Sequence, residues 1–182
     1  MEQSTAEPTT NPILVAVDLS DRTTACLAHG CRLAAKLRQP LILLHVVHES
    51  GETLGMYRRH PHANVTTPNW EIARTMLEER VAAFRSEHDD CEGVGELRSV
   101  VVEGLPQTRI PEFAAHCGAD MLVMCSHIRR GLRHWLHGSV TEAVARHAPC
   151  PVVVVGREDD QRFTDVVPPP GLGEAYPSSP PS

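Results

Sequence analysis

Short apolar segments and longer amphipathic segments alternate through most of the chain. The apolar segments are too short for helices and rich in β-branched residues, which predicts buried strands at 13–18, 40–47, 96–103, 120–125 and 151–155. Between them, apolar side chains recur at helical spacing after Ser20, Asn69, Pro106 and Ser139. This alternation predicts an α/β fold, with an open five-stranded parallel sheet and helices on both of its faces.

The predicted helices have recognisable starts and one unusual residue. Ser20 is the expected N-cap of a helix that continues to Leu37, and Pro106 is expected in the first turn of a later helix. Pro111 should distort that later helix or move its start, because proline has no backbone N–H. In the helix at 69–88, the stripe expected to face the core consists of Trp70, Ala73, Leu77, Val81 and Phe84.

Both ends of the chain and one internal connection depart from this alternation. Residues 1–11 are polar and expected to be flexible, so the domain should cover 12–156. Residues 157–182 contain six prolines and an acidic cluster, and we expect them to be a disordered tail outside the fold. The connection at 48–68 is either a mobile surface loop or a lid over a ligand, formed by Tyr57, Arg58 and Arg59. This connection and the tail are the candidate contacts for other proteins.

The segment 120–155 carries the candidate binding chemistry. In open α/β sheets, ligands lie beyond the carboxyl ends of the strands, which here is the loop after Cys125. Gly138 and Ser139 open the next helix, whose free amides attract anions, and Glu142 completes a capping-box pattern. The same loop is cationic, which suits a phosphate and is equally typical of a solvated surface: it carries Arg129, Arg130 and Arg133.

One long stretch resembles a known family. The sequence SHIRRGLRHWLHGSVTEAVARHAPCPVVVV is similar to the C-terminal signature of the universal stress protein family, whose nucleotide-binding members carry G-x-x-G-x9-G-[ST]. The resemblance extends from about Pro12 to Gly156 and implies a Rossmann-like sheet with strand order 3-2-1-4-5. Two positions depart from the pattern, because Cys125 and Ile128 stand where the family has glycine.

The resemblance also implies a set of nucleotide contacts. Asp18 matches the family's V-x-V-D-x-S aspartate, which reaches the nucleotide, although an aspartate there could equally hold the turn. The backbone of Val46 matches the position that binds the adenine edge. The remaining contacts implied are Cys125, Ile128, Gly138, Ser139 and Val140, with Arg129 and Arg130 as candidate phosphate ligands.

The two missing glycines lower the affinity expected for ATP. Glycine lets the backbone approach a phosphate and reach positive φ, which a β-branched isoleucine does badly. An isoleucine held in left-handed geometry carries strain of about 1–3 kcal/mol, and its side chain could fill the phosphate volume. We therefore expect ATP, with Mg²⁺ if it binds, to be held weakly or not at all.

Composition excludes several classes of function. The net charge of −6 gives no overall basic field for nucleic acid. No apolar run reaches membrane-spanning length and the N-terminus does not have the pattern of a signal peptide, so we expect a cytosolic protein. The six cysteines have no CxxC spacing and are expected to be free thiols. We expect no metal site. Around His127, His134 and His137, no two histidines lie at HxH or HxxxH spacing on a predicted helix or strand.

The sequence does not indicate an enzyme. Ser139 has no assigned base, and His45 is most simply a strand-end histidine satisfied by a hydrogen bond. Slow ATP hydrolysis stays open.

The implied strand order leaves the last strand at an edge of the sheet. A short, uncharged, β-branched edge is prone to association, so we expect a homodimer through Pro151, Val152, Val153, Val154 and Val155. Two functions follow: a dimeric stress regulator or interaction protein with a degenerate nucleotide pocket, or an ATP-binding stress protein that uses Gly138 and Ser139. A metal-dependent enzyme ranks far behind both.

Overall fold

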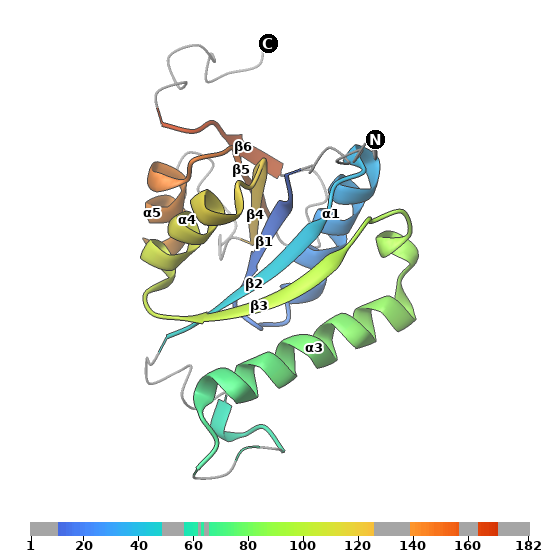
Figure 1. Ribbon diagram of the computed structural model, residues 1–182, viewed down its shortest axis with the longest axis vertical. Helices are drawn as coiled ribbons and strands as arrows, with labels where there is room; N and C mark the ends of the chain where they lie inside the picture. Colours follow the sequence, from blue (N-terminus) through green and yellow to red (C-terminus); the bar gives the residue numbers. More distant parts are fainter. Residues whose placement is uncertain are drawn as a thin grey trace, which may run out of the picture.

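The sheet has six strands in the order β3-β2-β1-β4-β5-β6 (Figure 1). The computed structural model describes residues 11–48, 57–61, 63, 66–125, 139–156 and 164–170. The first five strands are parallel and follow the predicted order, whereas β6 runs antiparallel to β5. The strands are β1 Ile13–Val17, β2 Leu41–Val47, β3 Leu97–Glu103, β4 Met121–Cys125, β5 Val152–Val155 and β6 Thr164–Val167.

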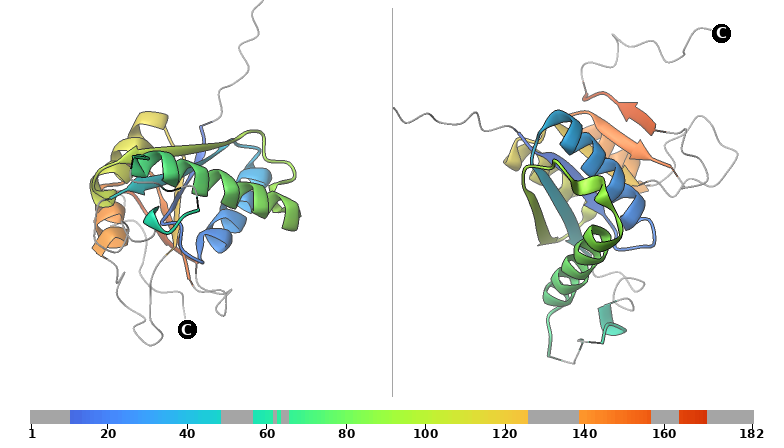
Figure 2. Two further views of the ribbon diagram at one scale, coloured as in Figure 1. Left: turned by 90° about the horizontal axis from the view of Figure 1, so that it is seen from below. Right: turned by 90° about the vertical axis from the view of Figure 1, so that its right-hand side faces the viewer.

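Helices cover both faces of the sheet, as predicted. Helices α1 and α3 lie on one face and α4 and α5 on the other (Figures 1 and 2). The bounds are α1 Thr23–Leu37, α3 Asn69–Glu87, α4 Pro106–Cys117 and α5 Ser139–His147, with a short 3-10 helix, η1, at Asp89–Cys91. No helix in the described part of the chain is long and apolar enough to cross a membrane.

Each central strand contributes to two hydrophobic cores. In β1, Ile13 and Val15 face α1 and α3, whereas Leu14 and Ala16 face α4 and α5. Because both faces of a parallel sheet are covered, both sets of side chains are apolar. This is why the strand appears in the sequence as a continuous apolar run instead of an alternating one.

Helix α1 approaches β1 closely at one glycine. A Cβ atom on Gly30 would lie 2.3 Å from Cγ2 of Val15, far too close for two carbon atoms that are not bonded. The missing side chain therefore sets the distance between the helix and the strand. That distance positions the start of α1 at the edge of the sheet where β1 ends.

Two predicted helix details are wrong. Arg22, not Ser20, precedes the first residue of α1, and the Ser20 hydroxyl instead accepts the Arg22 N–H at 3.3 Å. Trp70 is 41% exposed, with the Arg74 guanidinium 5.7 Å from its ring centroid, and Ile72 takes its place in the core. Trp70 lies in the first turn of α3, where a cation covers its ring in place of core side chains.

Helix α4 begins at Pro106, the residue predicted for its first turn. The helix continues through Pro111, which is buried, so this proline does not move the start. Its ring takes a place in the apolar face that packs on the sheet.

The prediction that residues 157–182 lie outside the fold is wrong for four of them. Residues 164–167 form β6, which pairs along the whole of β5 from Val152↔Val167 to Val155↔Thr164. The β5 edge is therefore occupied by the same chain, and the reason given for a homodimer, an unpaired β5, does not hold in this structure. Residues 1–10, 157–163 and 171–182 lie outside the described residues.

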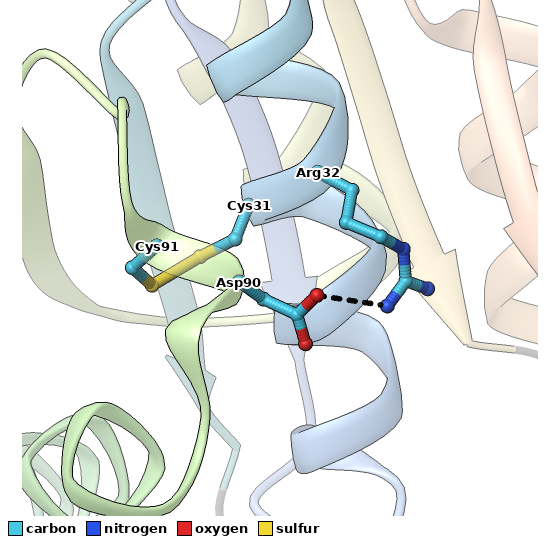
Figure 3. Close-up of polar contacts among 4 residues, drawn as sticks. All are labelled: Cys31, Arg32, Asp90 and Cys91. Carbon is cyan, nitrogen blue, oxygen red and sulfur yellow. Dashed lines mark hydrogen bonds and ion pairs between the residues drawn. A yellow bond between two sulfur atoms is a disulfide. The ribbon is translucent and has the colours of Figure 1, made fainter.

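The prediction that all six cysteines are free is wrong for one pair. Cys31 in α1 and Cys91 in η1 form a disulfide across 60 residues of sequence (Figure 3). Beside it, Arg32 and Asp90 form an ion pair at 3.3 Å. The other four cysteines are free thiols, at positions 26, 117, 125 and 150.

Candidate functional site

A pocket of about 190 Å³ opens at the carboxyl ends of β1, β2 and β4. The ends of these strands supply its floor, and the first turns of α1, α4 and α5 supply its walls. Parallel strands all end at the same edge of a sheet, so the helices that follow them all begin there. The lining is mainly apolar and consists of Ala16, Val17, Asp18, Arg22, Thr23, Cys26, Leu44, His45, Val46, His48, Pro106, Ile110, Met124, Cys125, Val140 and Thr141.

Four of the predicted ligand residues line this pocket: Asp18, Val46, Cys125 and Val140. They come from three strand ends and one helix start, separated by as many as 122 positions in the sequence (140 − 18). The pocket therefore lies where the resemblance placed a nucleotide.

The rest of the predicted set is only partly placed. Ser139 is the first residue of α5, and nothing is described of its side chain. The Glu142 carboxylate accepts from Arg146 in the next turn, and the predicted capping box involves residues that are not fully described. Five predicted residues lie outside the described part of the chain: Ile128, Arg129, Arg130, Arg133 and Gly138.

Asp18 holds the turn between β1 and α1. Its Oδ1 accepts the backbone N–H of Ser20 at 3.0 Å, which is the structural role considered for it. Leu19 between them has φ = 60° and is 2% exposed, so the turn places this side chain in the core and leaves Asp18 at the pocket. A leucine in left-handed geometry costs about 1–3 kcal/mol, and such strain is typical of functional sites.

Both ring nitrogens of His45 form hydrogen bonds. Its Nδ1 lies 2.8 Å from the carbonyl oxygen of Val17, which can only accept, so Nδ1 carries the proton. Its Nε2 then accepts from the Tyr57 hydroxyl at 2.7 Å. Burial lowers the pKa of His45, which favours this neutral tautomer. The prediction of a strand-end histidine satisfied by hydrogen bonds is confirmed.

Tyr57 does not extend over the pocket as a lid residue. Its side chain is fully buried, and burial raises its pKa to about 12, so the hydroxyl keeps its proton as a donor. The tyrosine therefore anchors part of the 48–68 connection beneath the strand ends.

Two thiols lie side by side in the pocket wall. Hydrogen bonding with Cys125, followed by burial, raises the pKa of Cys26 well above its usual value. The Cys125 thiol also donates to the carbonyl oxygen of Arg22 at 3.5 Å, which joins the end of β4 to the start of α1. The Cys125 side chain stands where the family pattern has glycine, and the raised pKa of Cys26 keeps that thiol protonated, which makes it a poor nucleophile.

Sequence reasoning missed the threonines of the pocket. Thr23 is 2% exposed, and its Oγ1 is one of the buried polar atoms of the described residues that lack a hydrogen-bond partner. Thr141 in the first turn of α5 is 5% exposed. The only sequence signal was a pair of poor helix formers, Thr23 and Thr24, at a helix start. A buried hydroxyl without a partner costs about 1–3 kcal/mol unless a ligand satisfies it.

The electrostatics of the pocket suit a polar or anionic ligand. Helices α1, α4 and α5 all begin at its wall, and each helix N-terminus carries about half a positive charge on unpaired amides. Within the described ranges, no three histidine, cysteine or acidic side chains converge on a point where a metal ion could bind.

Comparison with known proteins agrees with this architecture. The model of the universal stress protein family matches residues 9–156. Universal stress protein MJ0531 of Methanocaldococcus jannaschii is 30% identical over 146 residues, covering 79% of this chain and 80% of that protein.

Two solved structures have the same fold. A universal stress protein in complex with cAMP is 20% identical, with a TM-score of 0.56 over 81% of this chain and 98% of that chain. One from Archaeoglobus fulgidus in complex with dAMP is 23% identical, with a TM-score of 0.55 over 80% and 98%. With its sheet, its pocket and a family match over 148 of 182 residues (156 − 9 + 1), this chain belongs to the universal stress protein family.

Proposed function

We propose that this protein binds the nucleoside part of an adenine nucleotide and acts as a stress-response regulator without being an enzyme. The observation that carries the proposal is the pocket at the carboxyl ends of β1, β2 and β4, in which Asp18, Val46 and Val140 meet. The family resemblance assigns the backbone of Val46 to the adenine edge, has Asp18 reach the nucleotide, and includes Val140 among the implied contacts. The Thr23 hydroxyl adds a buried polar atom that a ligand can satisfy.

The ligands named for related structures support a nucleotide with one phosphate. The two structures described above hold cAMP and dAMP, which are both adenine monophosphates. A ligand of this kind needs the nucleoside half of the pocket and few contacts to phosphate.

The phosphate side of the pocket lacks the two glycines of the family pattern. At Cys125 a thiol occupies the position where the family pattern has glycine, and the thiol is committed to Arg22 and Cys26. Ile128 replaces the second glycine, in a segment outside the described residues. We therefore propose that the β- and γ-phosphates of ATP add little to binding.

A regulatory role is more consistent with the pocket than catalysis. His45, the buried histidine of the lining, has both ring nitrogens in hydrogen bonds and cannot accept a proton from water or substrate. The Cys26 thiol has a raised pKa and does not supply a thiolate. Binding without turnover suits a protein whose occupied and empty forms differ in what they contact, through residues 48–68 or the tail.

Titration calorimetry with adenosine, AMP, cAMP and ATP with Mg²⁺ tests this proposal. We expect AMP and ATP to bind within about threefold of each other, a difference of less than about 1 kcal/mol. If ATP binds more than about tenfold tighter than AMP, the phosphate side is functional and the ATP-binding alternative is correct. If none of the four ligands binds, the pocket is not a nucleotide site and the interaction protein is the better description.

Restoring the glycines tests the phosphate side directly. Ile128→Gly with Cys125→Gly should tighten ATP binding at least about tenfold while leaving adenosine unchanged. Ser139→Ala in that background should weaken ATP binding again, because the first residue of α5 would then contact phosphate. An equal gain for adenosine would mean that the substitutions act on the pocket as a whole.

A second variant tests the nucleoside side. Asp18→Asn keeps an oxygen at Oδ1 for the Ser20 N–H but removes the negative charge, so the turn should survive. We expect weaker binding of adenosine at unchanged protein stability, because a neutral oxygen accepts a ribose hydroxyl less strongly.

A further inference from the structure

The C-terminal strand β6 covers the edge of the sheet that would otherwise end at β5. Its four residues pair antiparallel with all four residues of β5, in the register Val153↔Val166 and Val154↔Asp165. This pairing satisfies a backbone edge that no other described element approaches from that side (Figure 2). Without β6, the uncharged β-branched strand β5 would be exposed to pairing with another chain.

The two valines of β6 have different surroundings. Val167 is partly buried against the core formed by α4, α5 and the sheet. Its neighbour Val166 points to the opposite face and is 60% exposed. Of these two valines, Val167 is the one whose side chain adds to the backbone pairing of β6.

The sequence after β6 prevents the sheet from growing further. Pro168, Pro169 and Pro170 follow Val167 directly, and proline has no N–H to donate to a neighbouring strand. A strand of four residues that ends in prolines is a typical protected edge. Thus β6 both covers β5 and makes a poor edge for pairing itself.

The sequence of β5 suits pairing with a copy of itself. A two-fold axis between two molecules brings identical strands together antiparallel, which is also the direction of β6 on β5. Because β5 is four consecutive valines, antiparallel self-pairing puts valine opposite valine at every position. The same outer edge can therefore take either β6 or the β5 strand of a second molecule, but not both.

We propose that β6 is an intramolecular competitor that controls self-association of this protein through β5. With β6 docked, the chain is a monomer at this edge; with β6 released, two chains pair β5 to β5. Only residues 156–163 separate the two strands. Such a short connection gives an effective concentration of about 1 mM, so the docked form wins at micromolar protein. The inference is independent of any nucleotide in the pocket.

The full-length chain and two valine variants test this proposal. Val167→Asp puts a charge into the partly buried site and should release β6, whereas Val166→Asp makes the same change at the exposed site and is the matched control. Sedimentation velocity at about 5–100 µM should give a monomer for the wild type and for Val166→Asp, and a dimer for Val167→Asp. Hydrogen exchange should show that residues 164–167 are protected only in the two monomeric proteins.

Two results would overturn the proposal. One is a wild-type dimer whose residues 164–167 exchange freely, because β6 would then not compete. The other is a Val167→Asp monomer with freely exchanging β6, because β5 would then not be an association surface. Val167→Pro, which fixes φ inside β6 and removes the buried valine side chain instead of adding a charge, should behave like Val167→Asp.

A peptide control keeps the test decisive if the released form aggregates. A synthetic peptide of residues 161–170, QRFTDVVPPP, should bind the vacant β5 edge of Val167→Asp and restore a soluble monomer. The same peptide with the Val167→Asp change should have no effect. If neither peptide restores the monomer, aggregation does not proceed through β5 and the proposal fails.

Discussion

The Tyr57 hydroxyl lies 2.7 Å from Nε2 of His45 and joins two segments that are separate in the sequence. Tyr57 belongs to the connection after β2, and His45 lies near the end of β2, in the pocket lining. Because His45 also donates to Val17 in β1, one hydrogen-bonded chain links β1, β2 and the connection. The position of the pocket floor therefore depends on a tyrosine that does not line the pocket.

Removing the Tyr57 hydroxyl should destabilise the protein. Tyr57→Phe keeps the buried ring but leaves Nε2 of His45 buried without a donor, which costs about 1–3 kcal/mol. Urea unfolding measures the change, with Trp70→Phe, at an exposed aromatic residue, as the control. Equal effects of the two variants would show that the hydrogen bond does not contribute.

His45 should make stability depend on pH. Its pKa is lowered in the folded protein, so the unfolded chain binds the proton more readily. The stability that the neutral histidine contributes is complete above its unfolded pKa of about 6.5 and is lost as pH falls below that value. His45→Asn keeps a donor for the Val17 carbonyl but cannot titrate, so it should lose less stability between about pH 7.5 and about pH 5. An unchanged loss would assign the pH dependence elsewhere, for example to His29, whose pKa burial also lowers.

The sequence was sufficient for the parts of the fold that depend on local patterning. The run from Ile13 to Val17 is apolar because β1 is buried on both faces, and its short length and β-branched residues identify it as a strand. The stripe of α3 was predicted correctly except for Trp70, whose position in the first turn leaves it partly exposed. Periodicity identifies the face of a helix but does not tell where along the helix the core ends.

The close packing of α1 on β1 should make Gly30 irreplaceable. Gly30→Ala would place a Cβ atom 2.3 Å from Val15, and the shift needed to relieve the overlap costs about 1–3 kcal/mol. This loss exceeds the gain of up to about 1 kcal/mol that alanine brings to a helix. Gly95→Ala is the control, since no atom lies within 4 Å of a Cβ built there, and thermal unfolding compares the two. A Gly30→Ala protein as stable as the wild type would mean that the helix moves freely.

The disulfide between Cys31 and Cys91 should contribute to stability. Closing a loop of 60 residues in the unfolded chain is worth about 4 kcal/mol as an upper value. A reducing agent should lower the unfolding free energy of the wild type and leave Cys91→Ser unchanged. Thiol titration of the unreduced, unfolded wild type should find four free thiols. Six free thiols in the purified, oxidised protein would contradict the disulfide. In protein blocked directly in cells, six free thiols would mean that the reducing cytosol keeps the pair open, in line with the predicted cytosolic location.

Tertiary contacts between residues distant in the chain could not be predicted from the sequence. Cys31 and Cys91 show no motif, because their proximity depends on how η1 packs against α1. Strand β6 was hidden in an acidic, proline-rich tail, where Val166 and Val167 are too few to form a periodic pattern. Both features depend on what the rest of the fold leaves uncovered, which composition does not reveal.

The pocket was located from the strand ends, but Thr23 was missed. Whether its hydroxyl is buried without a hydrogen-bond partner depends on the packing of the folded chain and leaves no pattern in the sequence.

Thr23 should separate the requirements of the ligand from those of the fold. Valine has the shape of threonine without the hydroxyl, and the Oγ1 atom of Thr23 is buried without a hydrogen-bond partner. Thr23→Val should therefore leave the free protein as stable as the wild type or more stable by up to about 1 kcal/mol. If adenosine or AMP pairs with this hydroxyl, the same variant should bind it about five- to tenfold more weakly, a loss of about 1–1.4 kcal/mol. Thr24→Val makes the identical change at a residue that does not line the pocket, and it should leave ligand affinity unchanged. A structural role for the hydroxyl predicts the reverse, a less stable Thr23→Val protein with normal affinity, so unfolding and calorimetry on these two variants decide between the roles.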